Sequence, residues 1–234
     1  MKFVYIASPY HADTPEEMER NKQFAHAACE QAYRLGRING IKIIPVTPIG
    51  NFPYLDDHKP DEREQALHMG TALLSKCDEL WVAGDRISEG MRGEIRAAAR
   101  MDKPIYSLGI EQQKIQEAIF DMLPMLDERQ CFQTSDRRDY TGQLLIVKPS
   151  ALTPWSIEPE NQLWIATHGN GCRPDAKGRS VLVENLFDGD KASFDRSDFY
   201  GVANVKRLPD WAQKAFEEYQ QQQNSENESE EQDL

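Results

Sequence analysis

The sequence lacks three features that would place it in a familiar class at once. No apolar stretch approaches the length of a membrane span, so we expect no membrane partner. The four cysteines are widely spaced and include no CxxC pair, which favours reduced thiols in a cytoplasmic protein. The chain has a net charge of -12 and no block of basic residues, so we also expect no nucleic-acid partner.

The negative charge is concentrated at the C-terminal end. Of the 39 acidic groups, seven lie in residues 217–234, which contain no basic group. Residues 1–216 contain the other 32 acidic groups and all 27 basic groups. Such a polar, charged composition is typical of segments that do not fold. We therefore expect residues 217–234 to form a disordered acidic tail.

Short apolar runs alternate with stretches of helical spacing in the first half of the chain. The expected strands cover residues 3–7, 41–45, 80–83 and 103–108, and the expected helices cover 15–35, 61–76, about 88–101 and 110–126. Thr14 can cap the first helix, and Gly36 is expected to end it. This alternation predicts an α/β domain over residues 1–126: a Rossmann/flavodoxin-like parallel sheet with helices on both faces.

The second half has a different pattern. Apolar runs at 143–147, 163–167 and 180–184 are separated by Gly, Pro and Asp clusters, which predicts a small α+β or β-rich accessory domain over residues 127–216. His168 and Cys172 are spaced so that both could bind zinc, but no second pair accompanies them. We therefore interpret residues 169–171 as a tight turn, and we attach no function to this domain.

One stretch, residues 78–94, carries the features of a binding site. A buried strand leads through a turn into a helix that begins near Ser88 or Gly90. Ligands of open α/β sheets bind where strand carboxyl ends meet helix amino ends, and a helix N-terminus favours anions. Gly90 and Gly93 allow close backbone approach, and Glu94 places a carboxylate about one turn into the helix. The pattern predicts a phosphate or hydroxyl clamp beside a carboxylate.

Four motifs in the first half support a resemblance to a known family. In chain order they read V-Y-I-A-S-P-Y at 4–10, F-P-Y-L-D-D at 52–57, C-D-E-L-W at 77–81 and S-E-G-M-R-G-E at 88–94. Together they resemble an uncharacterised branch of the nucleoside 2-deoxyribosyltransferase-like superfamily, which also contains deoxynucleoside 5'-monophosphate N-glycosidases. The resemblance covers roughly residues 1–110.

The resemblance implies an activity and a set of site residues. The glutamate of the last motif attacks the anomeric carbon in that superfamily, which makes Glu94 the expected nucleophile. Ser88 matches the serine that binds the 5'-phosphate in the monophosphate glycosidases, and Tyr5 and Ser8 match positions that line the sugar pocket. The remaining expected substrate-binding residues are Asp85, Gly90 and Met91. The resemblance implies no cofactor and no metal, and it implies a homo-oligomer, at least a dimer.

One position departs from the family pattern. Family members usually carry an aspartate eight residues before Asp78, where this chain has Gly70. That aspartate helps to bind the sugar or assists the departing base. Glu64, Asp57 or Asp85 could take its place, or the activity could be lost.

Three hypotheses therefore stay open. The first is an enzyme that hydrolyses or exchanges the N-glycosidic bond of a nucleoside or nucleotide through Glu94. The second is a non-catalytic nucleotide-binding or sensing module, which the glycine at position 70 favours. The third is a structural or interaction protein with a vestigial pocket. For Glu94 itself the alternative is a solvated helix-surface residue that forms an ion pair with Arg92, Arg96 or Arg100.

Overall fold

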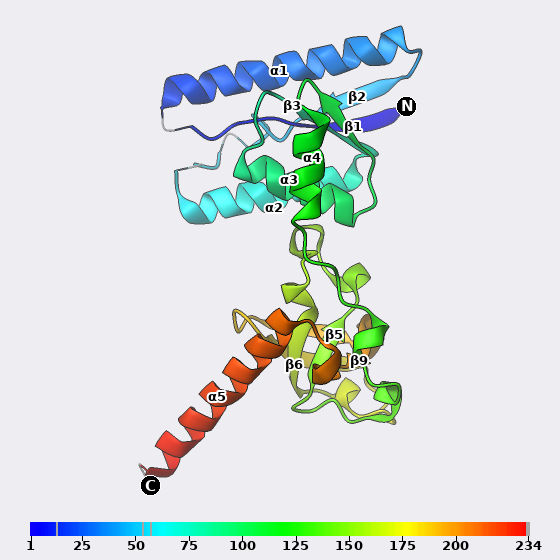
Figure 1. Ribbon diagram of the computed structural model, residues 1–234, viewed down its shortest axis with the longest axis vertical. Helices are drawn as coiled ribbons and strands as arrows, with labels where there is room; N and C mark the ends of the chain where they lie inside the picture. Colours follow the sequence, from blue (N-terminus) through cyan, green and yellow to red (C-terminus); the bar gives the residue numbers. More distant parts are fainter. Residues whose placement is uncertain (13, 53, 57, 233–234) are drawn as a thin grey trace. The chain divides into compact units, whose positions relative to one another are not determined.

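The computed structural model describes residues 1–12, 14–52, 54–56 and 58–232, and it divides into two compact units, Met1–Met122 and Leu123–Leu234. The first unit contains β1 (Lys2–Ala7), α1 (Pro15–Ile38), β2 (Ile43–Val46), α2 (Pro60–Lys76), β3 (Glu79–Ala83), α3 (Glu89–Arg100), β4 (Ile105–Leu108) and α4 (Gln112–Phe120). The second contains β5 (Leu144–Val147), β6 (Leu163–His168), β7 (Ser180–Asn185), β8 (Lys191–Asp195), β9 (Phe199–Val202) and α5 (Asp210–Gln232). Figure 1 shows the helices and strands of both units.

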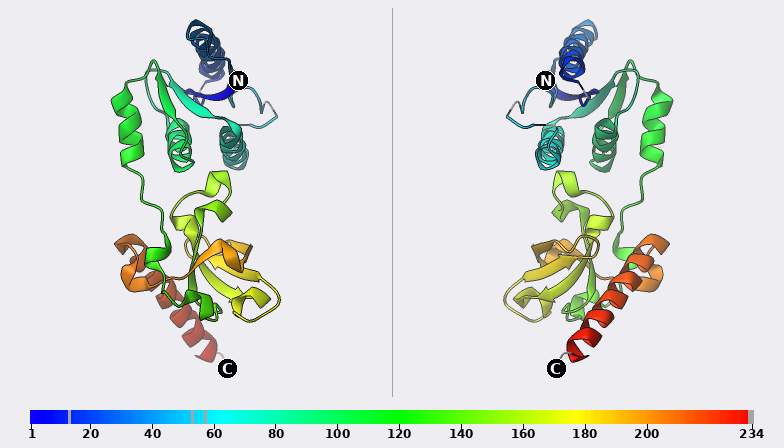
Figure 2. Two further views of the ribbon diagram at one scale, coloured as in Figure 1. Left: turned by 90° about the vertical axis from the view of Figure 1, so that its right-hand side faces the viewer. Right: turned by 90° about the vertical axis from the view of Figure 1, so that its left-hand side faces the viewer.

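The first unit is a four-stranded parallel sheet in the order β2-β1-β3-β4. Alternate side chains of β1 point to opposite faces, as the two-residue period of a strand requires. Val4 and Ile6 pack against Ala28 and Ala32 of α1, whereas Tyr5 on the other face packs among residues of α2, α3 and α4. The helices therefore flank both faces of the sheet (Figure 2), and the parallel α/β core predicted from the sequence is confirmed.

The first helix does not end where the sequence analysis expected. Thr14 does cap α1, since its side chain accepts a hydrogen bond from the backbone N–H of Glu17 at 3.3 Å. Gly36, however, lies inside the helix and is buried, and a Cβ there would lie 2.8 Å from Ile43 Cγ1. The chain leaves the helix through Asn39 and through Gly40, whose φ of 70° suits glycine. Gly36 thus serves close helix–strand packing.

The fourth helix is shorter than expected. The sequence analysis predicted a helix over 110–126, but α4 ends at Phe120 with Asp121 as its C-cap. Pro124 follows within one turn of that cap, and proline cannot donate the backbone hydrogen bond that a helix interior needs. The residues after the helix lead into the second unit.

The second unit is built on a five-stranded antiparallel sheet in the order β8-β7-β6-β5-β9. One face packs against Trp211, Ala212 and further apolar residues of α5. Strands at the three apolar runs named above are confirmed, while β8 and β9 were not predicted. Lys191–Asp195 contains three polar residues, and a glycine interrupts Phe199–Val202, so neither reads as an apolar strand.

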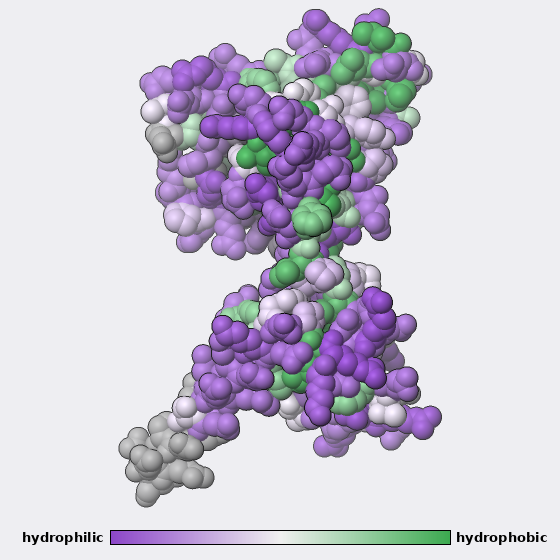
Figure 3. Space-filling model, viewed as in Figure 1, coloured by the Kyte–Doolittle hydropathy of each residue, from purple (hydrophilic) through white to green (hydrophobic). Residues whose placement is uncertain are grey.

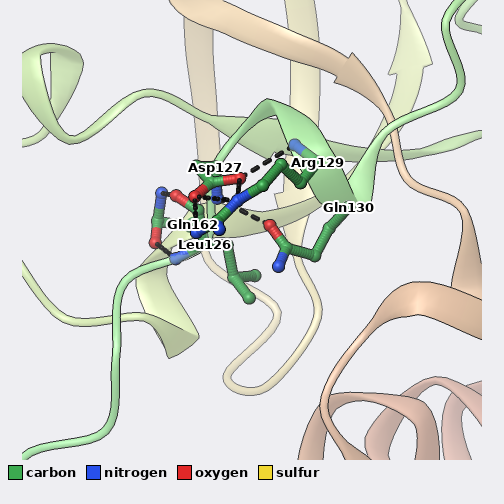
Figure 4. Close-up of polar contacts among 5 residues, drawn as sticks. All are labelled: Leu126, Asp127, Arg129, Gln130 and Gln162. Carbon is green, nitrogen blue, oxygen red and sulfur yellow. Dashed lines mark hydrogen bonds and ion pairs between the residues drawn. The ribbon is translucent and has the colours of Figure 1, made fainter.

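Buried side-chain hydrogen bonds attach the start of the second unit to its sheet (Figure 4). Gln162 is fully buried; its Oε1 accepts from the Leu126 N–H at 2.7 Å, and its Nε2 donates to the carbonyl oxygens of Leu126 and Val147. Asp127 caps the next turn and pairs with Arg129 at 2.6 Å. Gln162 therefore satisfies backbone groups that burial would otherwise leave without partners.

The acidic C-terminal segment also differs from its expectation. The sequence analysis expected disorder over 217–234, but α5 continues to Gln232, and the last two residues lie outside the described part of the chain. Glutamate and glutamine are good helix formers, and the helix is anchored by Phe216 and Tyr219, which pack on the sheet core. A helix that is packed at one end can extend into a segment that could not nucleate one alone.

The surface seen in Figure 3 is mainly hydrophilic over both units. In the first unit, hydrophobic residues gather where α1 ends and β1 begins, and they include Met1, Ile38 and Ile41, which are exposed. This is the end of the sheet where its strands start. No helix in the described ranges is both long and apolar enough to cross a bilayer.

The packing of Gly36 gives a first prediction. Gly36→Ala gains helix propensity but forces a methyl group against Ile43 and against the Ile41 carbonyl oxygen at 2.9 Å, so we expect a net loss of about 1–3 kcal/mol in the free energy of unfolding. Gly93→Ala is the matched control, because a Cβ there meets nothing within 4 Å, and it should stabilise by about 0.5–1 kcal/mol. Urea unfolding of both variants measures the difference. Equal effects would contradict the packing role of Gly36.

Candidate active site

A cavity of about 340 Å³ opens at the end of the sheet where the parallel strands finish. Ser8 follows β1, and Pro48, Ile49 and Gly50 follow β2. Met18 and Lys22 of α1 form one wall, and the loop after β2 contributes Phe52, Leu55 and Asp56. The remaining lining residues are Tyr10, His11, Arg63, Ala66, Leu67, Gly70, Ser88, Gly90, Met91 and Glu94. The cavity belongs entirely to the first unit.

The Glu94 side chain reaches the cavity from the second turn of α3 and is held there by a buried tyrosine. Tyr5, fully buried in β1, donates a hydrogen bond from its hydroxyl to Glu94 Oε1 at 2.6 Å. Burial raises the pKa of Glu94 to about 7, and the hydrogen bond from Tyr5 opposes part of that rise. Burial and the adjacent carboxylate raise the pKa of Tyr5 well above its usual value, so the tyrosine stays a donor.

The glycine at position 70 makes room for this pair. Gly70 is buried in α2, and a Cβ built on it would lie 3.2 Å from the Tyr5 hydroxyl oxygen and 3.6 Å from Pro48 Cβ. Any larger side chain would therefore compete with the hydroxyl that contacts Glu94. The Tyr5 hydroxyl that donates to Glu94 thus lies beside the space that a side chain at position 70 would enter.

The N-terminus of α3 forms another part of the wall. Ser88 is the N-cap, and its Oγ accepts a hydrogen bond from the Met91 N–H at 3.3 Å. Gly90 and Met91 line the cavity, so the first backbone amides of the helix lie beside it. These amides and the helix dipole favour an anionic group.

Ser8 contributes an unsatisfied polar atom. Only 7% of Ser8 is exposed, and its Oγ has no hydrogen-bond partner among the residues that the structure describes. A buried hydroxyl without a partner costs free energy that a bound polar group would recover. The Ser8 hydroxyl is therefore available to a water molecule or to a polar group bound in the cavity near the end of β1.

The structure brings together most of the residues that the sequence analysis singled out. Ser8, Ser88, Gly90, Met91 and Glu94 all line the cavity, and Tyr5 lies beneath Glu94 as its hydrogen-bond donor. Glu94 is therefore not a helix-surface residue paired with a neighbouring arginine.

Asp85 is the exception among the predicted substrate-binding residues. It is exposed and does not line the cavity; its backbone oxygen accepts a hydrogen bond from Lys114 at 3.2 Å. Glu64, a second suggested replacement for the family aspartate, is exposed on α2 and pairs with His68 at 3.8 Å. Asp57, the third, lies outside the described residues.

Sequence reasoning did not identify the cationic residues of the cavity. Lys22 comes from α1 and Arg63 from the first turn of α2, and both are half-buried. His11 also lines the cavity, with its ring edge-on to that of His58 at a centroid distance of 6.0 Å. Isolated basic residues on helices carry no motif, and only the fold brings them to the same cavity as Glu94. Within the described ranges, no group of three or more His, Cys, Asp or Glu could hold a metal ion.

The comparison with known families covers the part of the chain that forms this cavity. A family model described as "Domain of unknown function (DUF7768)" matches residues 2–108, which span β1 to β4 and include every lining residue. That description assigns no activity. No curated protein matches the chain.

The Tyr5–Glu94 pair gives a second prediction. Tyr5→Phe removes the hydrogen bond that lowers the pKa of Glu94, so that pKa should rise further above about 7. Titration of the labelled Glu94 carboxyl carbon by NMR measures the change, with the exposed Tyr33→Phe as the matched control. A Glu94 pKa that is the same in the two variants would show that the hydrogen bond does not act on the carboxylate.

Proposed function

We propose that the protein cleaves the N-glycosidic bond of a nucleoside or nucleoside 5'-monophosphate, with Glu94 as the nucleophile. The observation that carries the proposal is a partly buried carboxylate, held by Tyr5, that shares a cavity with a helix N-terminus. A carboxylate of this kind can attack an anomeric carbon as a glycosidic bond breaks.

The arrangement suggests a role for each group around the substrate. The hydrogen bond from Tyr5 fixes one carboxylate oxygen and leaves the other to approach the anomeric carbon. The Gly90 amide and the Ser88 hydroxyl, which already accepts from the Met91 N–H, would bind a 5'-phosphate, and the unsatisfied Ser8 hydroxyl would bind a sugar hydroxyl or a phosphate oxygen. Apolar residues of the loop after β2 would limit the access of water to the intermediate.

The fold supports this placement. The strand order β2-β1-β3-β4 agrees with the first four strands of a flavodoxin-like sheet, whose ligands bind at the switch point between β1 and β3. Ser8 follows β1 at that point, and α3 begins after β3. We therefore propose a Rossmann/flavodoxin-like core related to the nucleoside 2-deoxyribosyltransferase-like superfamily. The homo-oligomer implied by that relationship stays a prediction.

The second candidate is a nucleotide-binding module without turnover. It is favoured by Gly70, since this position offers no carboxylate to assist the departing base. The two candidates differ in a direct assay: the full chain is incubated with 2'-deoxynucleoside 5'-monophosphates, and free base is followed by chromatography. Thermal stabilisation by nucleotides without base release would identify the binding module.

The pKa of Glu94 gives the third prediction. Attack requires the ionised carboxylate, so kcat/KM for base release should rise about tenfold per pH unit below pH 7 and level off above it. Tyr5→Phe, which raises the pKa of Glu94, should move this limb to higher pH. Glu94→Gln should lower the rate at least about a thousandfold while nucleotide binding persists.

Controls for this profile are available on the same helix. Glu89→Gln removes an exposed carboxylate from the first turn of α3, outside the cavity lining, and should leave the pH profile unchanged. Base release by Glu94→Gln at the rate of the unchanged protein would remove Glu94 from the mechanism.

A further inference from the structure

The proposed function does not specify how the departing base is stabilised. When the bond between the anomeric carbon and the base nitrogen breaks, its electron pair stays on the base, which must gain a proton or meet positive charge. Among the described residues, the carboxylates that line the cavity are Asp56 and Glu94, and Glu94 is the proposed nucleophile. Asp56 is exposed, and its Oδ1 accepts a hydrogen bond from the His58 N–H at 3.1 Å within its own loop.

Two cationic side chains line the cavity, and the geometry of α2 gives the distance of one of them from Glu94. Arg63 lies two helical turns before Gly70 on α2, which corresponds to about 10 Å along the helix axis. The Glu94 carboxylate lies at the Gly70 end, because the Tyr5 hydroxyl contacts both positions. A nucleophile and a leaving group occupy opposite sides of the reacting carbon, so the base extends away from Glu94 along this wall. Lys22 of α1 lines the same cavity.

The surroundings strengthen the effect of these charges. Phe52, Leu55 and Leu67 line the cavity together with Lys22 and Arg63. Apolar walls reduce the screening of a charge interaction relative to bulk water. An arginine presents N–H donors to carbonyl oxygens and ring nitrogens, as in the bidentate contact with the O6 and N7 atoms of guanine.

We propose that Arg63 and Lys22 stabilise the departing base as an anion, and that the site therefore selects bases with ring carbonyl groups over bases with amino groups. This inference rests on the proposed function. The Glu94 carboxylate forms a bond to the anomeric carbon, the bond to the base breaks, and its electron pair delocalises onto carbonyl oxygens that accept hydrogen bonds from the two cations. The base then takes a proton from a water molecule, and the hydroxide that remains attacks the anomeric carbon of the ester, which releases the sugar and regenerates the Glu94 carboxylate.

Two matched pairs of substrates test this selectivity in the full chain. The first pair is the 2'-deoxynucleoside 5'-monophosphates of uracil and cytosine, and the second is those of hypoxanthine and adenine. In each pair the first base has a ring carbonyl group where the second has an amino group. We expect kcat/KM for base release to be at least about tenfold higher for uracil and hypoxanthine. This factor corresponds to about 1.4 kcal/mol of transition-state stabilisation.

Substitution of the cations should remove the preference. Arg63→Met and, separately, Lys22→Met should each lower kcat/KM for the carbonyl bases about 10- to 100-fold and for the amino bases much less, so the ratio within each pair approaches one. Arg63→Lys should restore part of the preference. Arg20→Met is the matched control, since Arg20 is exposed on α1 outside the cavity and pairs with Glu17 at 3.6 Å.

The possible outcomes separate this inference from the proposed function. Base release at equal rates within each pair, unchanged in folded Arg63→Met and Lys22→Met, overturns the inference and leaves Glu94 chemistry in place. A loss of base release confined to His11→Gln also overturns it, because that result assigns protonation of the base to the imidazole. No base release from any of the four substrates overturns both proposals.

Discussion

The arrangement of the site depends on the hydrogen bond from Tyr5 to Glu94. It crosses from a buried strand to a helix on one face of the sheet, and it joins residues 89 positions apart in the chain. A buried carboxylate without a donor is costly, so Tyr5 makes this burial tolerable while it still allows the pKa of Glu94 to reach about 7. Gly70 is part of the same constraint, because a Cβ at this position would lie 3.2 Å from the Tyr5 hydroxyl oxygen and would crowd it.

The remainder of the cavity follows from where the parallel strands end. Residues after β1 and β2 and the first turn of α3 meet at that end of the sheet, which brings together an unsatisfied serine hydroxyl, helix amides and a carboxylate. Cations from α1 and α2 lie on the other walls. A chain with a net charge of -12 thus has a site that combines groups suited to an anionic substrate.

Much of this was predictable because it depends on local pattern. Alternating apolar runs and helix caps identified β1 to β4 and predicted the start of α3 near Ser88 or Gly90, where Ser88 proves to be the N-cap, and the S-E-G-M-R-G-E motif pointed to Glu94. The end of α1 was predicted wrongly, because a glycine that ends a helix and one that permits close packing look the same in sequence. Gly36 is distinguished only by the position of Ile43.

The parts that were not predictable depend on contacts between distant residues. The sequence shows a tyrosine, a glycine and a glutamate, but not that the hydroxyl of the first fills the space left by the second. Lys22 and Arg63 carry no motif, and Asp85, although close in sequence to Ser88, is directed away from the cavity by the turn after β3. The two strands β8 and β9 were missed because their side chains are too polar to form an apolar run.

The most direct test of the account is the covalent intermediate. The protein would be incubated with 2'-fluoro-substituted deoxynucleoside 5'-monophosphates, in which the fluorine slows hydrolysis of a sugar ester, and then digested and analysed by mass spectrometry. The account predicts a fluorosugar phosphate attached to the peptide that contains Glu94, and its absence in Glu94→Gln. An adduct on another carboxylate, or base release with inversion at the anomeric carbon and no adduct, would contradict it.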